Sequence, residues 1–128
     1  MTLLLDTHAF IWWDSAPDKL SSRARAACQD RTNLLFLSVA SAWEMQIKLQ
    51  LDKLKLTLPL SELLESQRQT NHLEILPILL PHVVALPQLP AHHKDPFDRL
   101  LIAQAAVEDV VILSNDPMFP KYTNKVLW

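Results

Sequence analysis

The stretch Leu3-Leu4-Leu5-Asp6 decides the fold, because three consecutive leucines predict a strand buried on both faces and the aspartate marks its carboxyl end. Two later apolar runs end in the same way: Leu34-Leu35-Phe36-Leu37-Ser38, with Glu44 following, and Val110-Val111-Ile112-Leu113-Ser114-Asn115-Asp116. If these runs are parallel strands, their carboxyl ends share the edge at which open α/β sheets bind ligands. A fourth acid, Asp98, opens the helical stretch before the last run.

Four carboxylates at one edge repel one another unless a cation lies among them. We therefore expect a Mg²⁺ or Mn²⁺ site, and with it phosphate chemistry. Asp6 and Asp98 are expected to hold the principal cation, while Glu44 and Asp116 complete its shell through water or help to hold a second ion. Such a cation would lower the pKa of a bound water and prepare it for attack on a phosphate group.

Each acid also has an ordinary structural interpretation. Asp6 can cap a helix that starts at about residue 9. Asp116 precedes a proline, which is typical of a cap or a turn. Glu44 matches the S-x-x-E capping box with Ser41, but a helix that begins at Ser38 would place Glu44 almost two turns in and leave it free for the site.

The two acids of Asp95-Pro96-Phe97-Asp98 can be distinguished by their place relative to the proline. Asp95 precedes a proline at the first helical position and is predicted to be an ordinary N-cap. Asp98 lies inside the first turn, where the cap does not need it. We therefore place Asp98 in the site and Asp95 outside it.

The rest of the chain alternates short apolar strands with helical stretches, which predicts an α/β three-layer sandwich: a central, mostly parallel sheet of four to five strands flanked by helices. The length of 128 residues, 49% of them apolar, fits a single domain over residues 1–128. Strands are expected at residues 2–5, 34–37, 74–77, 110–113 and 125–128, and helices at 9–13, 21–30, 38–51, 60–71 (with Pro59 first), 82–86 and from Pro96 onward.

The composition excludes several classes of site. The chain has no glycine, so a P-loop, a GxGxxG dinucleotide turn and a nucleophile elbow are all excluded, and no nucleotide cofactor is expected. A net charge of −2 gives no global attraction to nucleic acid. The lone Cys28 predicts no intramolecular disulfide and a small buried side chain. Polar residues and prolines interrupt the apolar stretches, so we expect no signal peptide, no membrane span and a cytoplasmic protein.

Four segments in this order resemble the PIN-domain ribonucleases of the VapC toxin type. They are residues 3–8 (Leu-Leu-Leu-Asp-Thr-His), 38–44 (Ser-Val-Ala-Ser-Ala-Trp-Glu), 92–105 (His-His-Lys-Asp-Pro-Phe-Asp-Arg-Leu-Leu-Ile-Ala-Gln-Ala) and 114–116 (Ser-Asn-Asp). The long block at 92–105 is the most specific of the four. The resemblance extends over essentially the whole chain.

This resemblance implies a toxin of a two-gene toxin–antitoxin module. Such a protein cuts RNA with Mg²⁺ or Mn²⁺, leaves a 5′-phosphate and a 3′-hydroxyl, forms a homodimer, and is silenced by a small cognate antitoxin. The acidic quartet of the family carries over to Asp6, Glu44, Asp98 and Asp116, and its polar residue beside the fourth acid corresponds to Ser114 or Asn115.

Other side chains are candidates for contacts with RNA or with partners. Lys94, Arg99 and Lys48 lie close in sequence to the acids and could steer RNA, although solvated surface charge is the commoner role for such residues. His92 and His93 could reach metal or phosphate, but loop histidines are more often surface residues. The tryptophans favour core packing first and a docking surface second; they are Trp12, Trp13 and Trp43.

Two other functions remain open at this point. One is a non-catalytic protein-binding module in which the acids are caps. The other is a different Mg²⁺-dependent phosphate hydrolase with Asp6 as nucleophile. Dehalogenase-type phosphatases would need a second aspartate where this chain has His8, which disfavours that mechanism.

Overall fold

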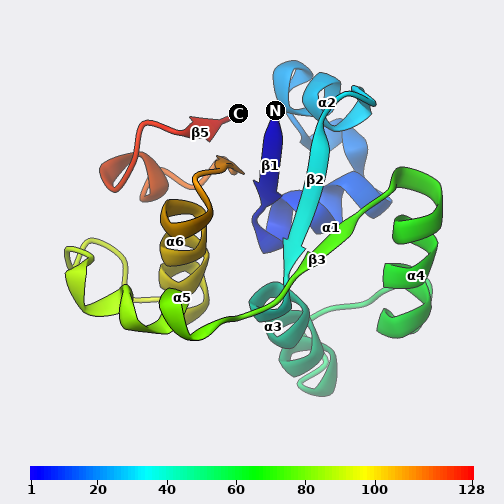
Figure 1. The fold of residues 1–128 in the computed structure, drawn as a ribbon. Coiled ribbons are helices and arrows are strands. Elements are labelled where there is room, and N and C mark those ends of the chain that lie inside the picture. The colour runs from blue at the N-terminus through cyan, green and yellow to red at the C-terminus, as the bar shows by residue number, and fades with distance from the viewer.

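A five-stranded sheet forms the centre of the computed structural model, which describes residues 1–128. The strand order is β3-β2-β1-β4-β5, and all four pairings are parallel. Figure 1 shows helices packed around this sheet. The strands are β1 (Thr2–Leu5), β2 (Leu34–Ser38), β3 (Glu74–Leu76), β4 (Val111–Leu113) and β5 (Val126–Leu127), and the α-helices are α1 (Thr7–Ser15), α2 (Ser22–Gln29), α3 (Val39–Gln50), α4 (Leu60–Asn71), α5 (Leu80–Val84) and α6 (Pro96–Glu108).

The side chains of β1 alternate between two apolar clusters, one on each face of the sheet. Leu3 and Leu5 pack into the larger cluster with residues of α1, α2, α3 and α4. Leu4 packs into the smaller one with residues of α6 and β4. The predicted three-layer α/β sandwich is therefore confirmed, and the central strand is buried on both faces because helices cover both.

Local capping explains where two helices begin. Ser21 accepts a hydrogen bond from Ala24 N at 3.0 Å and caps α2. Ser38 accepts one from Ala40 N at 3.0 Å and caps α3, as predicted. These side chains satisfy amide groups that would otherwise lack partners at the helix start.

Three predicted helix starts were wrong, each by one or two residues. Helix α1 starts at Thr7 rather than residue 9, because Asp6 caps it directly. Helix α5 starts at Leu80 rather than residue 82, since the ring of the buried His82 accepts a hydrogen bond from Leu79 N at 2.9 Å. Pro59 is the N-cap of α4 rather than its first residue.

Three short 3-10 segments complete the chain, and the sequence did not predict them. They are η1 (Pro17–Lys19), η2 (Leu86–Gln88) and η3 (Phe119–Lys121), each with proline in its first two positions. Cys28 is a free, buried cysteine, as expected, and burial raises the pKa of its thiol to about 12. None of the helices has the length and apolar character needed to cross a membrane.

Candidate metal centre at the carboxyl edge of the sheet

The site lies at the switch point of the sheet. The chain runs outward from β1 to β2 and β3 on one side, and then returns to add β4 and β5 on the other. Ligands of open α/β sheets bind at the carboxyl ends of the strands at this point. The end of β1 is joined to β4 by a hydrogen bond from Asp6 N to Leu113 O at 3.1 Å. Asp6 directly follows β1 and Ser114 directly follows β4, so the two residues lie side by side.

Asp6 is both a helix cap and a buried acid of the site. Its Oδ1 accepts a hydrogen bond from Ala9 N at 2.7 Å, and its Oδ2 accepts one from the Ser114 hydroxyl. The residue is 5% exposed. Burial raises the pKa of Asp6, while the hydrogen bond from Ser114 acts in the opposite direction. Capping thus orients this carboxylate and does not remove it from the site.

Glu44 lies in the second turn of α3, so the capping-box interpretation with Ser41 is wrong. The side chain is buried and turns toward the start of α1. Its Oε1 accepts a hydrogen bond from Thr7 Oγ1 at 2.7 Å, and its Oε2 pairs with Lys48 Nζ at 2.9 Å. Glu44 is consequently fixed beside Asp6, the residue that precedes Thr7.

Asp95 and Asp98 take the two different positions predicted for them. Asp95 Oδ1 accepts hydrogen bonds from Phe97 N at 2.8 Å and Asp98 N at 3.0 Å, which confirms the N-cap. Burial raises the pKa of Asp98 to about 7; nearby Asp95 adds to this rise, His93 opposes it, and Glu44 and Asp6 contribute further. Asp98 Oδ1 makes no hydrogen bond or ion pair to the protein.

Asp116 closes the site from the turn after β4. Its Oδ1 accepts a hydrogen bond from Met118 N at 2.9 Å, so the turn role is real. Its own N–H donates to Ser114 Oγ at 3.0 Å, and its Oδ2 lies 3.1 Å from His93 Nε2. The Ser114 hydroxyl therefore touches two acids at once.

The four predicted acids share one electrostatic environment. Asp6 and Glu44 both raise the pKa of Asp98, and Asp116 raises that of Asp6. Ligand atoms of His93, Asp98 and Asp116 lie within 4.8 Å of one another. The buried Asp6 and the half-buried Asp98 both have raised pKa values, so their negative charge is unfavourable, and a hard divalent cation with a preference for oxygen ligands would relieve it. These residues fit a Mg²⁺ or Mn²⁺ site.

Comparison with known proteins identifies the family. A sequence model of the PIN domain matches residues 3–125. The chain belongs to the PIN-domain family.

Individual relatives agree with this assignment. Ribonuclease VapC22 of Mycobacterium tuberculosis is 31% identical over 105 residues, which are 81% of this chain and 78% of the relative. This PIN domain is therefore of the VapC type. Among solved structures, VapBC2 from Rickettsia felis, bound to a DNA fragment from its promoter, aligns over 100% of this chain and 98% of its own with a TM-score of 0.68. FitAcB from Neisseria gonorrhoeae aligns over 98% and 96% with a TM-score of 0.60. Both are 17% identical, so they show the shared fold alone.

The candidate RNA-steering cations of this PIN domain lie in three different settings. Lys48 is held by Glu44. The guanidinium of Arg99 makes intramolecular hydrogen bonds, to Pro90 O at 3.0 Å and to Leu86 O at 3.2 Å. Lys94 is exposed and has no ion pair with an acid. Asn115 is also exposed, in the turn between Ser114 and Asp116.

For His93 the sequence offered two roles, a contact with metal or phosphate and the commoner position on the surface. This residue was expected on the surface, yet its side chain is only 15% exposed and its Nε2 lies 2.9 Å from Asp98 Oδ2. The signal that could have found it is its position two residues before the N-cap Asp95, which turns its ring back toward the helix start. His92 is exposed, as expected, and packs against Tyr122 with ring centroids 5.3 Å apart.

Proposed function

We propose that this protein is a Mg²⁺- or Mn²⁺-dependent endoribonuclease, a VapC-type toxin that a cognate antitoxin neutralises, with Asp6, Glu44, Asp98 and Asp116 as its acidic site. The relative named Ribonuclease VapC22 supports the nuclease activity. One observation carries the metal dependence: Asp98 lies near three other acids with a pKa of about 7, and its Oδ1 has no hydrogen bond or ion pair within the protein. This oxygen is therefore available to a cation, whose charge would offset the repulsion between the acids.

The protein side of the mechanism follows from how the carboxylates are held. Oxygens of Asp98 and Asp116 lie within 4.8 Å of each other, and the charges of Asp6, the N-cap of α1, and Glu44, on α3, act on Asp98. When bound, a divalent cation would supply positive charge against the scissile phosphate and lower the pKa of a water for attack. Hydrogen bonds from Ala9 and Ser114 fix the Asp6 carboxylate, so the donor set is organised before the metal arrives.

The charge of the site accounts for a steep dependence on the cation. Without metal, the acids repel the RNA backbone, and the chain as a whole has a net charge of −2. Lys94 is the cation best placed to meet the RNA, because it is exposed and lies four residues before Asp98. The product ends expected from hydrolysis are a 5′-phosphate and a 3′-hydroxyl.

The rival phosphatase mechanism fits the geometry less well. A covalent mechanism needs a free carboxylate oxygen on Asp6 to attack the phosphorus. Both oxygens of Asp6 already accept hydrogen bonds, and the residue is 5% exposed. One accepted hydrogen bond leaves each oxygen a lone pair for a cation, but an attacking oxygen must also leave these bonds and reach the substrate, so burial favours a fixed metal ligand over a nucleophile.

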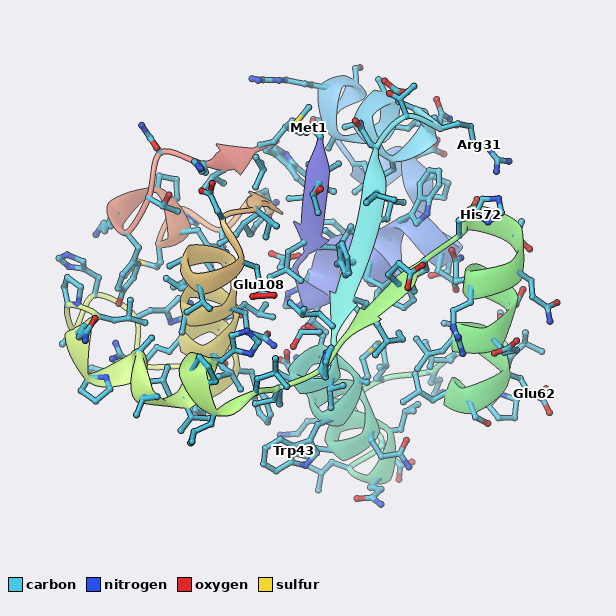
Figure 2. The ribbon with its side chains drawn as sticks, in the orientation of Figure 1. Met1, Arg31, Trp43, Glu62, His72 and Glu108 are labelled. Atoms are coloured by element: carbon cyan, nitrogen blue, oxygen red, sulfur yellow. The ribbon has the colours of Figure 1, made fainter.

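Exposed apolar side chains support the proposed protein partners. Trp43 on α3 is 58% exposed and projects from the helix (Figure 2), with its ring edge-on to Phe97 at 5.2 Å. A second group lies on and just before α5 and includes Leu80, which is 74% exposed. Surfaces of this kind are typical of protein interfaces. We propose that they serve the antitoxin and a second copy of the chain, in a single cytoplasmic domain over residues 1–128.

The test is cleavage of a structured RNA by the purified protein. Cleavage is expected with Mg²⁺ or Mn²⁺, and none with chelator. Asp6→Asn and Asp98→Asn are expected to lower the rate at least 100-fold, on the order of the loss seen when a group that stabilises transition-state charge is removed. Glu62→Gln on α4 (Figure 2), outside the site, is the matched control and should cleave at the wild-type rate. Undiminished cleavage in chelator would reject the metal mechanism.

A further inference from the structure

His93 is held in place by contacts on several sides. Its N–H donates to the Tyr122 hydroxyl at 2.6 Å, and its carbonyl accepts a hydrogen bond from Arg99 Nη1 at 3.4 Å. Its ring lies near Phe119, with centroids 6.1 Å apart. The imidazole is thus built into the loop before α6 and cannot swing freely.

The hydrogen bonds assign the position of the ring proton. Asp95 N–H donates to His93 Nδ1 at 3.2 Å, so Nδ1 offers its lone pair and the proton of the neutral ring is on Nε2. Nε2 lies 2.9 Å from Asp98 Oδ2 and 3.1 Å from Asp116 Oδ2. The Nε2–H hydrogen bond goes to Asp116 in the turn after β4, while Asp98 in the first turn of α6 lies at ion-pair distance from the same nitrogen.

We propose that His93 is a positioning residue: its Nε2 bridges Asp116, through a hydrogen bond, and Asp98, through a close polar contact, and so holds the two carboxylates with lone pairs available to one cation. This inference rests on the proposed metal site. Coordination by Nε2 itself is disfavoured, because the ring proton would have to move to Nδ1, where it would meet the N–H of Asp95. Hydrogen bonds of this kind to ligating carboxylates raise metal affinity by fixing their orientation.

Two amide variants separate the contacts of the ring. In His93→Asn, the side-chain oxygen can replace Nδ1 as acceptor for Asp95 N–H, but nothing replaces Nε2. In His93→Gln, the terminal NH₂ can reach the position of Nε2 and restore a donor to the carboxylates. The exposed neighbour provides the matched control, His92→Asn.

Mn²⁺ affinity, measured from the electron paramagnetic resonance signal of the free ion, tests the proposal without activity. His93→Asn is expected to bind Mn²⁺ about 10-fold to 100-fold more weakly than wild type, His93→Gln within about 3-fold of wild type, and His92→Asn equally well. Wild-type affinity in His93→Asn, or an equal loss in His93→Gln, would overturn the bridging role. The pulsed spectrum of wild-type protein gives a second criterion that needs no variant: strong coupling from a directly bound nitrogen would make His93 a ligand and also overturn it.

The same titration separates this proposal from the proposed function. If wild type binds Mn²⁺ and Asp98→Asn does not, the metal site stands whatever His93 does. If wild type binds no better than Asp98→Asn, the metal site itself fails and the bridging role with it. The bridging role alone fails when Asp98→Asn is deficient and His93→Asn is not.

Discussion

The Ser114 hydroxyl donates a hydrogen bond to Asp6 Oδ2 and so joins two residues that are 108 positions apart in the chain. The Ser114 Oγ also accepts a hydrogen bond from Asp116 N at 3.0 Å. Because Asp6 follows β1 and Ser114 follows β4, one small side chain connects two strand ends and orients two acids of the site. Of the two candidates that the resemblance offered for the polar residue beside the fourth acid, Ser114 makes these contacts, whereas Asn115 is exposed.

Replacement of this serine should therefore affect stability as well as the site. Ser114→Ala leaves Asp6 Oδ2 and Asp116 N–H without their partner in a buried setting, so the free energy of unfolding should fall by about 1–3 kcal/mol. The pKa of Asp6 should rise further, since the lost hydrogen bond opposes the effect of burial. Urea denaturation measures the first effect. Asn115→Ala, at the exposed neighbouring position, should change stability by less than about 0.5 kcal/mol, and an equal loss in both variants would contradict the assignment.

In contrast to Ser114→Ala, Asp98→Asn is expected to raise the free energy of unfolding of the metal-free protein. The pKa of Asp98 is about 7 in the folded protein against an ordinary value of 3.8, so between these pH values the folded state binds a proton that the unfolded chain has released. The contribution of Asp98 to stability therefore falls as pH rises from about 4 to about 7. At pH 8 in chelator, Asp98→Asn should be more stable than wild type by at least about 1 kcal/mol. At pH 4 the two should be equal, and a less stable variant at pH 8 would show that Asp98 has a structural role instead.

Metal binding should become stronger as pH rises and Asp98 loses its proton. A cation competes with the proton on Asp98, so Mn²⁺ should raise the unfolding temperature strongly at pH 8 and weakly at pH 5.5. The comparison is thermal unfolding at both pH values with Mn²⁺ or with chelator. A rise in unfolding temperature that is the same at both pH values, or that persists in Asp98→Asn, would exclude Asp98 from the cation site.

Asp95, three residues away, should give the opposite result to Asp98. It caps α6 through hydrogen bonds from Phe97 N and Asp98 N, and it makes no contact of its own with Asp116. Asp95→Ala should lower the free energy of unfolding by about 1 kcal/mol at pH 8, as is usual for loss of an N-cap. Asp95→Ser keeps a capping oxygen and should recover most of that loss. A stabilising effect of Asp95→Ala would mean that relief of its repulsion with Asp98, whose pKa Asp95 helps to raise, outweighs the loss of the cap.

The sequence predicted the sheet edge because the information is local. An all-apolar run followed by an acid identifies a buried parallel strand and its end, and Pro96 distinguishes the capping Asp95 from Asp98. The start of α3 could likewise be read from Ser38, which placed Glu44 inside the helix. In each case a propensity of one or two residues was enough.

The partners of the acids could not be predicted in this way, because they come from distant parts of the chain. Thr7 reaches Glu44 across 37 positions, and His93 reaches Asp116 across 23. Nor did the cap role of Asp6 exclude it from the site, since its two oxygens serve two different donors. Treating cap and site as alternatives was the physical error, because a carboxylate has lone pairs for both.

Lys94 is exposed and lies four residues before Asp98 in the sequence. If it contacts a phosphate of single-stranded RNA, Lys94→Ala should reduce the slope of log K against log salt by about 0.7, the release of one counterion. Binding is best measured in chelator with Asp98→Asn, in which RNA is not cut and one repelling charge is absent. Lys53→Ala, an exposed loop lysine, is the control and should leave the slope unchanged. An unchanged slope for Lys94→Ala would make Lys94 a solvated surface charge.

Replacement of Arg99 would not test RNA contact alone. Its guanidinium donates hydrogen bonds to Leu86 O, Pro90 O and His93 O, so its loss would also loosen the loop that carries His93.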